Sequence, residues 1–399
     1  MTDTLLSLRR VLVLLCVLWQ IALCAVAMRR SLHGGVDFRA FYTAGRSIAA
    51  GHGAMIYDYD ATAEAERAWV SADDRVLPYL YPAFGALLFV PFAAVGYKCA
   101  FVAFTVANIG LLTIVARWFA HRSGSGSEWH VWVPFCFLPV AVALVQGQIS
   151  VMLLAIFVGM HCSFERGRFF SAGLLLSLAL IKFQLAMPVF AVMLLWRCWR
   201  LIAGFGVGAV SVGLVSLHVA GRAGMLEYVR STMEMAGKIA SDPAAAKDKY
   251  GMFPADMPNL QGAAFALMHG GLPSLLLLGV ASAGLLWWVG RQRPGVPVAL
   301  TAALLVSYHL EIYDLTLLLL PLSVIVGESS RAVVRYNAMQ RSAVGVWMLV
   351  AGLATPVAVL PMAAGCSWIY GAASVMVLRM LSRSRESSPV LVPVRAAAT

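Results

Sequence analysis

The chain has 399 residues, of which 61% are hydrophobic and only 12% are charged, and its mean hydropathy is +0.81. Soluble domains carry about a quarter charged residues, so this composition excludes a soluble globular domain. The net charge of +11 comes from Lys and Arg residues that stand singly or in pairs between apolar runs. That pattern is typical of membrane-orientation signals and argues against a nucleic-acid-binding surface.

Apolar runs of about 20 residues, long enough to cross a bilayer, recur from Val11 to Met380. Backbone polar groups must be satisfied inside the membrane, and these runs do not alternate as barrel strands do, so they are predicted to be helices. Arg9 and Arg10 precede the first run and place the N-terminus in the cytoplasm. The predicted fold class is therefore an all-α polytopic membrane protein.

The basic connections between the runs fix which of them cross, because all of them are expected on the cytoplasmic side. Segment 79–97 is apolar but short and carries Pro82 and Pro91. If it crossed, every later basic loop would lie outside, so we expect that it does not cross and instead lies in the membrane interface or dips into the membrane and returns. The result is about 12 crossings, with both termini cytoplasmic, near 11–28, 99–116, 131–145, 150–163, 169–181, 185–196, 201–219, 272–290, 296–310, 314–327, 342–360 and 366–380.

These crossings predict a single transmembrane domain over residues 1–381 with two sizeable loops on the outer face. The first loop covers residues 29–98, and the second covers residues 220–271. The polar, Pro-containing segment 382–399 is predicted to be a disordered cytoplasmic tail.

Asp37 lies a few residues past the end of the first crossing and is preceded by Gly34 and Gly35, which free the backbone to turn. The spacing from Asp37 to Phe41 and on to Ala44 or Ser47 indicates a short amphipathic helix lying on the membrane. A carboxylate is favoured at the N-terminal end of such a helix. Asp37 is therefore either a plain N-cap or a functional carboxylate.

Other isolated polar residues recur at the predicted outer ends of the crossings. An ionisable group at the centre of a membrane helix costs about 2.5–3.5 kcal/mol. Each residue alone is explained as a structural hydrogen-bonder, but their gathering at one face indicates a shared wet cavity. The set comprises Tyr81, Gln146, Gln148, Lys182, Asn259, Gln261, His309, Glu311 and Asp314.

The chain resembles glycosyltransferase family 87, the polyprenyl-phosphate-mannose-dependent mannosyltransferases and their relatives in the GT-C superfamily. Five runs carry the resemblance, in order from about residue 10 to about residue 325: DFRAFYTAGRSIAAGHGAMIYD, YLYPAFGALLFVPF, GQISVMLLAI, ERGRFFSAGLLLSLALIKFQLAMPV and HLEIYDLTLLLLPL. This chain departs from the family at two places. It has Tyr81-Pro82-Ala83 where the family often has Tyr-Pro-Pro, and Lys182-Phe183 where the family has Lys-Pro.

The resemblance implies a GT-C fold and transfer of a sugar at the periplasmic face of a bacterial inner membrane. The donor would be mannose or another hexose or pentose on a polyprenyl phosphate, and the acceptor a lipid or glycan. GT-C enzymes carry the catalytic carboxylate in the first outer loop, which corresponds to Asp37. It would act as general base in an inverting single displacement, with His309 assisting or orienting it.

The other candidates divide between the two substrates. Lys182 is the first candidate for the donor phosphate, followed by Arg46 and His309, with Tyr81 and Gln148 nearby. The sugar and the acceptor are assigned to Tyr42, Gln146, Asn259, Gln261, Glu311 and Asp314.

No cofactor is expected, since the sequence has no Gly-rich phosphate loop. Asp58-Tyr-Asp60 mimics a metal-binding DxD motif, but acidic pairs in loops are usually just solvated, so no metal is expected either. The alternative from another class is a membrane transporter or lipid flippase. It would need ionisable residues at mid-bilayer depth and broken helices in matched halves. A third possibility is a scaffold that keeps the fold without the chemistry.

Overall fold

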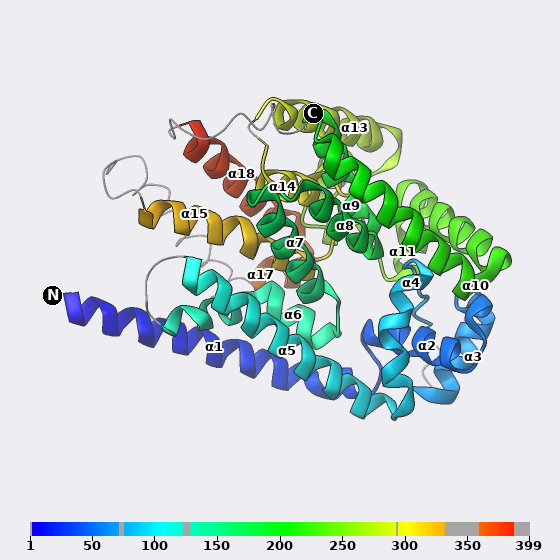
Figure 1. Cartoon of the computed structure of the whole chain (residues 1–399). Coiled ribbons are helices and arrows are strands. Elements are labelled where there is room, and N and C mark those ends of the chain that lie inside the picture. The colour runs from blue at the N-terminus through cyan, green and yellow to red at the C-terminus, as the bar shows by residue number, and fades with distance from the viewer. Residues whose placement is uncertain (1, 72–75, 123–127, 293, 332–358, 387–399) are drawn as a thin grey trace.

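The computed structural model describes residues 2–71, 76–122, 128–292, 294–331 and 359–386. Over these residues it consists of helices and connections, without strands (Figure 1). The all-α prediction is therefore confirmed for the described part of the chain.

The first half contains α1 (Thr2–Leu32), α2 (Phe38–Ala49), η1 (Gly53–Met55), α3 (Tyr59–Trp69), α4 (Ala83–Ala86), η2 (Leu87–Ala94), α5 (Tyr97–Arg122), η3 (Glu128–Cys136), α6 (Leu138–Gln146) and α7 (Ser150–Glu165), where η marks a 3-10 helix. The middle contains α8 (Phe169–Leu178), η4 (Ala179–Lys182), α9 (Phe183–Leu195), α10 (Trp199–Ser241), α11 (Pro243–Tyr250), η5 (Pro254–Asp256) and α12 (Leu260–Met268). The last part contains α13 (Gly271–Gly290), α14 (Val296–Val306), η6 (Ile312–Leu318), α15 (Leu319–Arg331), α17 (Leu360–Ala363), η8 (Ser367–Tyr370) and α18 (Gly371–Glu386).

Five helical stretches among the described residues are long and apolar enough to cross a bilayer: Arg10–Leu32, Tyr97–Arg122, Phe169–Leu195, Trp199–Ser241 and Gly271–Gly290. Four shorter apolar stretches accompany them: Ala83–Ala94, Ser150–Glu165, Val296–Val306 and Ile312–Val326. The protein is therefore a membrane protein, while the count of about 12 crossings stays a prediction.

Several predicted boundaries differ from the structure. The crossings predicted at 169–181 and 185–196 belong to one helical stretch that is interrupted only at Lys182, where φ is −126° and ψ is 72°. The crossing predicted at 296–310 ends as a helix at Val306. Residues 382–386, predicted to begin a disordered tail, continue α18. Residues 387–399 and most of the crossing predicted at 342–360 lie outside the described residues.

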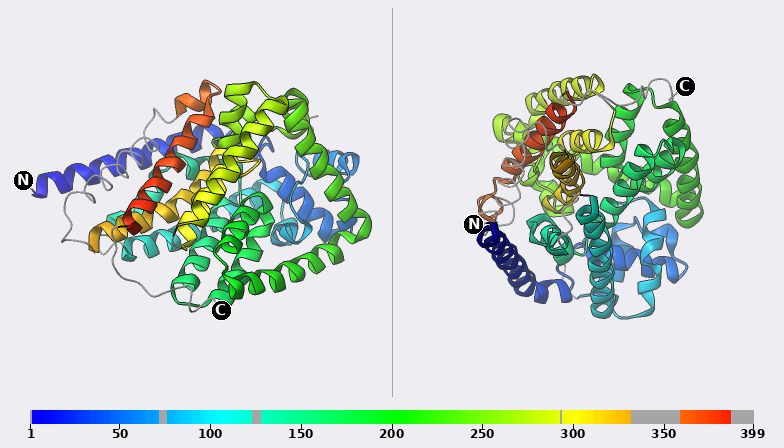
Figure 2. Two further views of the ribbon diagram at one scale, coloured as in Figure 1. Left: turned by 90° about the horizontal axis from the view of Figure 1, so that it is seen from above. Right: turned by 60° about the vertical axis from the view of Figure 1, so that its left-hand side comes forward.

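Helix α1 lies at the edge of the molecule in both views of Figure 2. Leu14 and Ile21 are each 57% exposed, and Val26 is 85% exposed. A row of exposed aliphatic side chains on a long helix is unfavourable in water, whereas lipid tails solvate it. This face of α1 is therefore the lipid-facing side, and the opposite side packs on η3 and α6.

Helices α8 and α10 pack closely because both carry small residues one turn apart. Gly173 and Ser177 on α8 lie against Gly204 and Gly208 on α10. A Cβ added at Gly204 would lie 2.1 Å from the carbonyl oxygen of Phe170, and one at Gly208 would lie 2.0 Å from Oγ of Ser177. Membrane helices associate through such small-residue contacts, because lipid supplies no hydrophobic force between them.

The first outer loop folds at the end of the molecule to which α1 leads, away from the N-terminus (Figure 1). Helix α2 starts one residue after Asp37, as predicted, but nine of its twelve residues are buried. Phe41 stacks on Phe89 of η2, with ring centroids 4.7 Å apart, and a Cβ at Gly45 would lie 2.6 Å from the Phe89 backbone. The helix expected to lie on the membrane surface is thus enclosed by its own loop. Segment 83–94 is shorter than the about 20 residues that a crossing needs, and its in-plane position stays a prediction.

The second outer loop begins at a kink in α10. Gly221 interrupts the helix with φ 65° and ψ 178°, close to the end of the crossing predicted at 201–219. Beyond the kink, Met235, Ile239, Tyr250 and other buried side chains form a small core of their own. The loop is therefore a folded unit, and Leu80 and Tyr308 from other segments pack against its core.

The close packing of α8 on α10 predicts a marked effect of Gly204→Ala. The added methyl group meets a backbone carbonyl, and overpacking of this kind costs about 1–3 kcal/mol. We expect a lower midpoint of thermal unfolding in detergent. Gly206→Ala is the matched control, because nothing lies within 4 Å of a Cβ there. Equal midpoints for the two variants would contradict this packing.

Candidate active site

A cavity of about 520 Å³ lies between the first outer loop, the α6–α7 turn, the connection from α14 to η6, and the second outer loop. Residues from widely separated parts of the sequence share its wall. Six of the residues singled out from the sequence line it: Asp37, Tyr81, Gln146, Gln148, His309 and Glu311. The structure thus brings half of the predicted site residues together in one place.

A glycine pair directs the chain from α1 to Asp37. Gly34 has φ +81°, and a Cβ there would lie 2.5 Å from Cγ1 of Val70. A Cβ at Gly35 would lie 2.7 Å from Cγ of Arg30, whose Nε donates a hydrogen bond of 2.9 Å to the Gly35 carbonyl oxygen. Both positions therefore need glycine, and the turn brings Arg30 and Asp37 to the same cavity.

The Asp37 side chain makes no capping hydrogen bond to α2, which removes the plain N-cap interpretation. Its Oδ2 instead accepts a hydrogen bond of 2.6 Å from Nε2 of Gln148. Oε1 of Gln148 accepts longer bonds of 3.4 Å from the Tyr81 hydroxyl and from the Ile149 amide. The amide oxygen of Gln148 therefore faces two donors and its nitrogen faces a carboxylate, which fixes the orientation of the amide. Gln148 in turn holds Asp37 on the cavity wall.

Tyr81 stays a hydrogen-bond donor in this arrangement. Burial and the nearby carboxylates of Asp37 and Asp314 raise the pKa of Tyr81 well above its usual range. The phenol therefore keeps its proton at physiological pH, and its hydroxyl is able to donate to Gln148.

Gly147 places both glutamines of the α6–α7 turn at the cavity. It ends α6 in the left-handed region, with φ 63° and ψ 41°, and a Cβ there would lie 2.6 Å from Cβ of Phe38. A side chain at this position would push α2 away from the turn. Glycine at position 147 is thus required by the close approach of α2 to the α6–α7 turn.

His309 and Glu311 lie in the 307–311 connection, outside the helices that are able to cross the membrane. His309 is 5% exposed, and its Nδ1 has no hydrogen-bond partner among the described residues. Burial and the nearby Lys182 lower the pKa of His309 to about 3, so the imidazole is neutral at physiological pH. Burial and the nearby Asp37 and Asp314 raise the pKa of Glu311 well above its usual range.

Lys182 and Asp314 lie behind the cavity wall and do not line it. Both side chains are fully buried, with Nζ of Lys182 2.5 Å from Oδ1 of Asp314. Ser150 donates to the same oxygen at 3.2 Å, and the Glu311 amide donates to Oδ2 at 3.1 Å. Nζ also lies 4.7 Å from the Tyr313 ring centroid. The pair therefore joins three elements and fixes the connection that carries His309 and Glu311.

Arg46 and Tyr42 are also absent from the cavity lining. Arg46 donates a bond of 2.7 Å to the Tyr42 hydroxyl, which donates to the Val95 carbonyl oxygen at 2.9 Å. The guanidinium lies 5.0 Å from the Trp69 ring centroid. These contacts tie α2 to the segment before α5.

Asn259 and Gln261 also take part in contacts that hold the fold together. The Asn259 side chain accepts bonds from the Gln261 and Gly262 amides at the start of α12, and it donates to the Ser307 carbonyl oxygen at 2.5 Å. It links the second outer loop to the 307–311 connection. Neither residue lines the cavity.

Three cavity residues close to Asp37 were not singled out from the sequence: Arg30, His33 and Arg39. Arg39 forms a buried ion pair with Glu66 at 2.7 Å, so its charge is balanced locally. Arg30 forms no ion pair with any described carboxylate. Its signal in the sequence was weak, because an arginine at the end of a membrane helix is common for other reasons.

The DxD-like pair does not face the cavity. Asp58 caps α3 by accepting a hydrogen bond of 2.8 Å from the Ala61 amide, and Asp60 is exposed in the first turn of that helix. No group of three or more His, Cys, Asp or Glu side chains suited to a metal ion occurs among the described residues.

Comparison with known proteins identifies the family. The model of glycosyltransferase family 87 matches residues 79–321, which is more than half of the chain and covers all the cavity segments except the first outer loop up to residue 78. No curated protein and no solved structure matches the chain. The chain therefore belongs to glycosyltransferase family 87, and it is a membrane glycosyltransferase.

Proposed function

We propose that this protein moves a sugar from a polyprenyl-phosphate carrier to a hydroxyl group of a lipid or glycan acceptor, with inversion and with Asp37 as general base. The observation that carries the proposal is the position of Asp37. Its carboxylate lies on the wall of the cavity, oriented by Gln148, and it is not used as a helix cap.

The chemistry requires one proton transfer and one displacement. The acceptor hydroxyl gives its proton to the Asp37 carboxylate while its oxygen attacks the anomeric carbon of the donor sugar. The bond from that carbon to the phosphate oxygen breaks, and the polyprenyl phosphate leaves with the electron pair. This leaving group is a weak base, so it needs a cation to balance its growing charge more than it needs an acid.

Arg30 is our candidate for that cation, in preference to Lys182. Lys182 is held by a buried carboxylate, whereas Arg30 lines the cavity and uses only Nε in its bond to Gly35. A guanidinium binds phosphate oxygens through two parallel bonds, which suits a leaving phosphate. In this arrangement Lys182 and Asp314 position the wall and do not touch the substrate.

His309 contributes as a neutral group. An imidazole that has lost its proton has one donor and one acceptor nitrogen, so His309 suits a sugar or acceptor hydroxyl better than a phosphate. Its Nδ1 has no hydrogen-bond partner within the described part of the chain, so a substrate hydroxyl would complete its hydrogen bonding. Glu311 and Gln146 on the same wall offer further contacts for hydroxyl groups.

The base is tested by transfer of labelled sugar from polyprenyl phosphates carrying mannose, glucose or arabinose to membrane lipid extract, with the protein in nanodiscs. We expect Asp37→Asn to lower kcat by about 10²–10⁴-fold, as for loss of a general base. The exposed Asp60→Asn in α3 is the matched control and should keep wild-type activity. Equal transfer by wild type and Asp37→Asn would keep the enzyme class and remove Asp37 as the base.

The phosphate-binding cation is tested with neighbouring arginines. We expect Arg30→Gln to lower kcat/KM for the donor by about 10²–10³-fold, as when one group that stabilises a developing charge is removed. Arg30→Lys should recover part of this loss. Arg29→Gln, an exposed neighbour that does not line the cavity, is the control. If both glutamine variants lose activity equally, the effect is one of local structure and the assignment fails.

The buried pair of Lys182 and Asp314 predicts that a second substitution restores the stability lost through the first. Lys182→Met alone strands the Asp314 carboxylate, and breaking a buried pair costs about 3–5 kcal/mol. We expect a large drop in thermal stability for the single variant and recovery of most of it in Lys182→Met with Asp314→Asn. The double variant should keep a KM for the donor near that of the wild type. A large rise in KM in this folded double variant would instead assign Lys182 to phosphate binding.

A further inference from the structure

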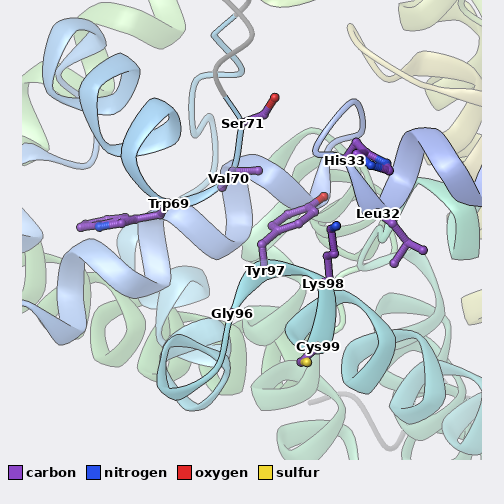
Figure 3. A pocket seen from close by; sticks show the side chains of 9 residues that line it. All are labelled: Leu32, His33, Trp69, Val70, Ser71, Gly96, Tyr97, Lys98 and Cys99. Atoms are coloured by element: carbon purple, nitrogen blue, oxygen red, sulfur yellow. The ribbon is translucent and has the colours of Figure 1, made fainter.

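A second pocket of about 430 Å³ adjoins the catalytic cavity at the outer ends of α1 and α5. It shares His33 and Ser71 with the cavity but does not include Asp37. Figure 3 shows Lys98 and Tyr97 directed towards the space between Ser71 and His33. The pocket lining is Leu32, His33, Trp69, Val70, Ser71, Gly96, Tyr97, Lys98 and Cys99.

The charge of this lining has one sign. It includes Lys98 but no Asp or Glu. Lys98 is exposed and forms no ion pair with any described carboxylate. Arg46 adds a further cation behind the wall, with its guanidinium over the Trp69 ring. A pocket of this composition favours an anion, and lysine is a common phosphate ligand.

The floor of the pocket is held in place by hydrogen bonds between the helix ends. The Tyr97 hydroxyl donates to the Ser31 carbonyl oxygen at 3.0 Å, and the Ser31 hydroxyl donates to the Val145 carbonyl oxygen at 2.8 Å. These bonds join α1, α5 and α6 at one level. Gly34 fits against Val70 on the other side. The pocket is thus formed by fixed elements.

The position of the pocket points to the bilayer as the source of its ligand. Exposed aliphatic residues run along both helices that end there, with Val26 on α1 and Val102 and Val106 on α5 exposed by 85%, 49% and 62%. In a membrane these faces meet lipid chains. A molecule whose chains lie along α1 and α5 would bring its headgroup to Lys98.

We propose that this pocket binds the phosphate-bearing headgroup of an anionic lipid, at a site separate from Asp37 and next to the catalytic cavity. The shared His33 and Ser71 form the boundary between the two. Two sources supply this chemistry: a bulk anionic phospholipid, or a polyprenyl phosphate on its way to or from the cavity. The binding itself does not depend on the proposed transfer reaction.

Cys99 provides a reporter that needs no enzyme activity. It is exposed and lines the pocket, so a bound headgroup should shield its thiol. The full-length protein is placed in nanodiscs of phosphatidylcholine alone, with added phosphatidylglycerol, or with added polyprenyl phosphate. The rate of Cys99 alkylation by a neutral maleimide is followed by peptide mass spectrometry, with Cys366 as internal reference.

We expect at least one phosphate lipid to slow alkylation of Cys99 by about threefold or more, which corresponds to two-thirds occupancy. Lys98→Gln should abolish the slowing, whereas Lys247→Gln, the same charge change in the second outer loop, should keep it. Slowing by phosphatidylglycerol identifies bulk phospholipid, and slowing by polyprenyl phosphate alone identifies the carrier. Unchanged rates in both lipids, or slowing that persists in Lys98→Gln, would overturn the proposal.

Discussion

The ion pair between Lys182 and Asp314 is the interaction on which the cavity wall depends. Both charges are fully buried, so neither is tolerable without the other. The pair also takes up the hydroxyl of Ser150 and the amide of Glu311, and so it joins α7, the break after α8 and the connection into η6. These contacts hold the ends of three separate helical segments together as one surface. His309 and Glu311 lie on this surface.

The opposite wall is set by backbone geometry and not by charge. Gly34, Gly35 and Gly147 each lie where a Cβ would collide with a neighbour, and two of them also have positive φ. Gly147 lets α2 approach the α6–α7 turn closely, and Gly34 and Gly35 shape the turn that leads to Asp37, which meets Gln148. The catalytic candidate is thus placed by two turns that have little freedom, while its side chain makes no capping hydrogen bond to α2.

The sequence predicted much of this arrangement for a definite physical reason. Isolated polar residues are costly in a membrane, so those that occur at one face are expected to line a shared wet cavity. The structure agrees, because one cavity is lined by Asp37, Gln146, Gln148, His309 and Glu311. The same rule does not distinguish a lone lysine that faces water from one that faces a buried carboxylate. The partner of Lys182 is 132 positions away, and only the fold reveals it. The predicted helix boundaries were wrong where short 3-10 segments take the place of the expected straight helices.

Arg30 exposes a related weakness of sequence analysis in membrane proteins. Arginine and lysine beside an apolar run are read as orientation signals or as residues that reach the interface, and that reading accounts for nearly all of them. At the C-terminal end of α1, however, the Arg30 side chain is hydrogen-bonded to Gly35 and lines the cavity. Gly35 is the distinguishing feature, since any larger residue would displace the Arg30 side chain. A cation at a helix end is therefore best judged together with the glycine that makes room for it.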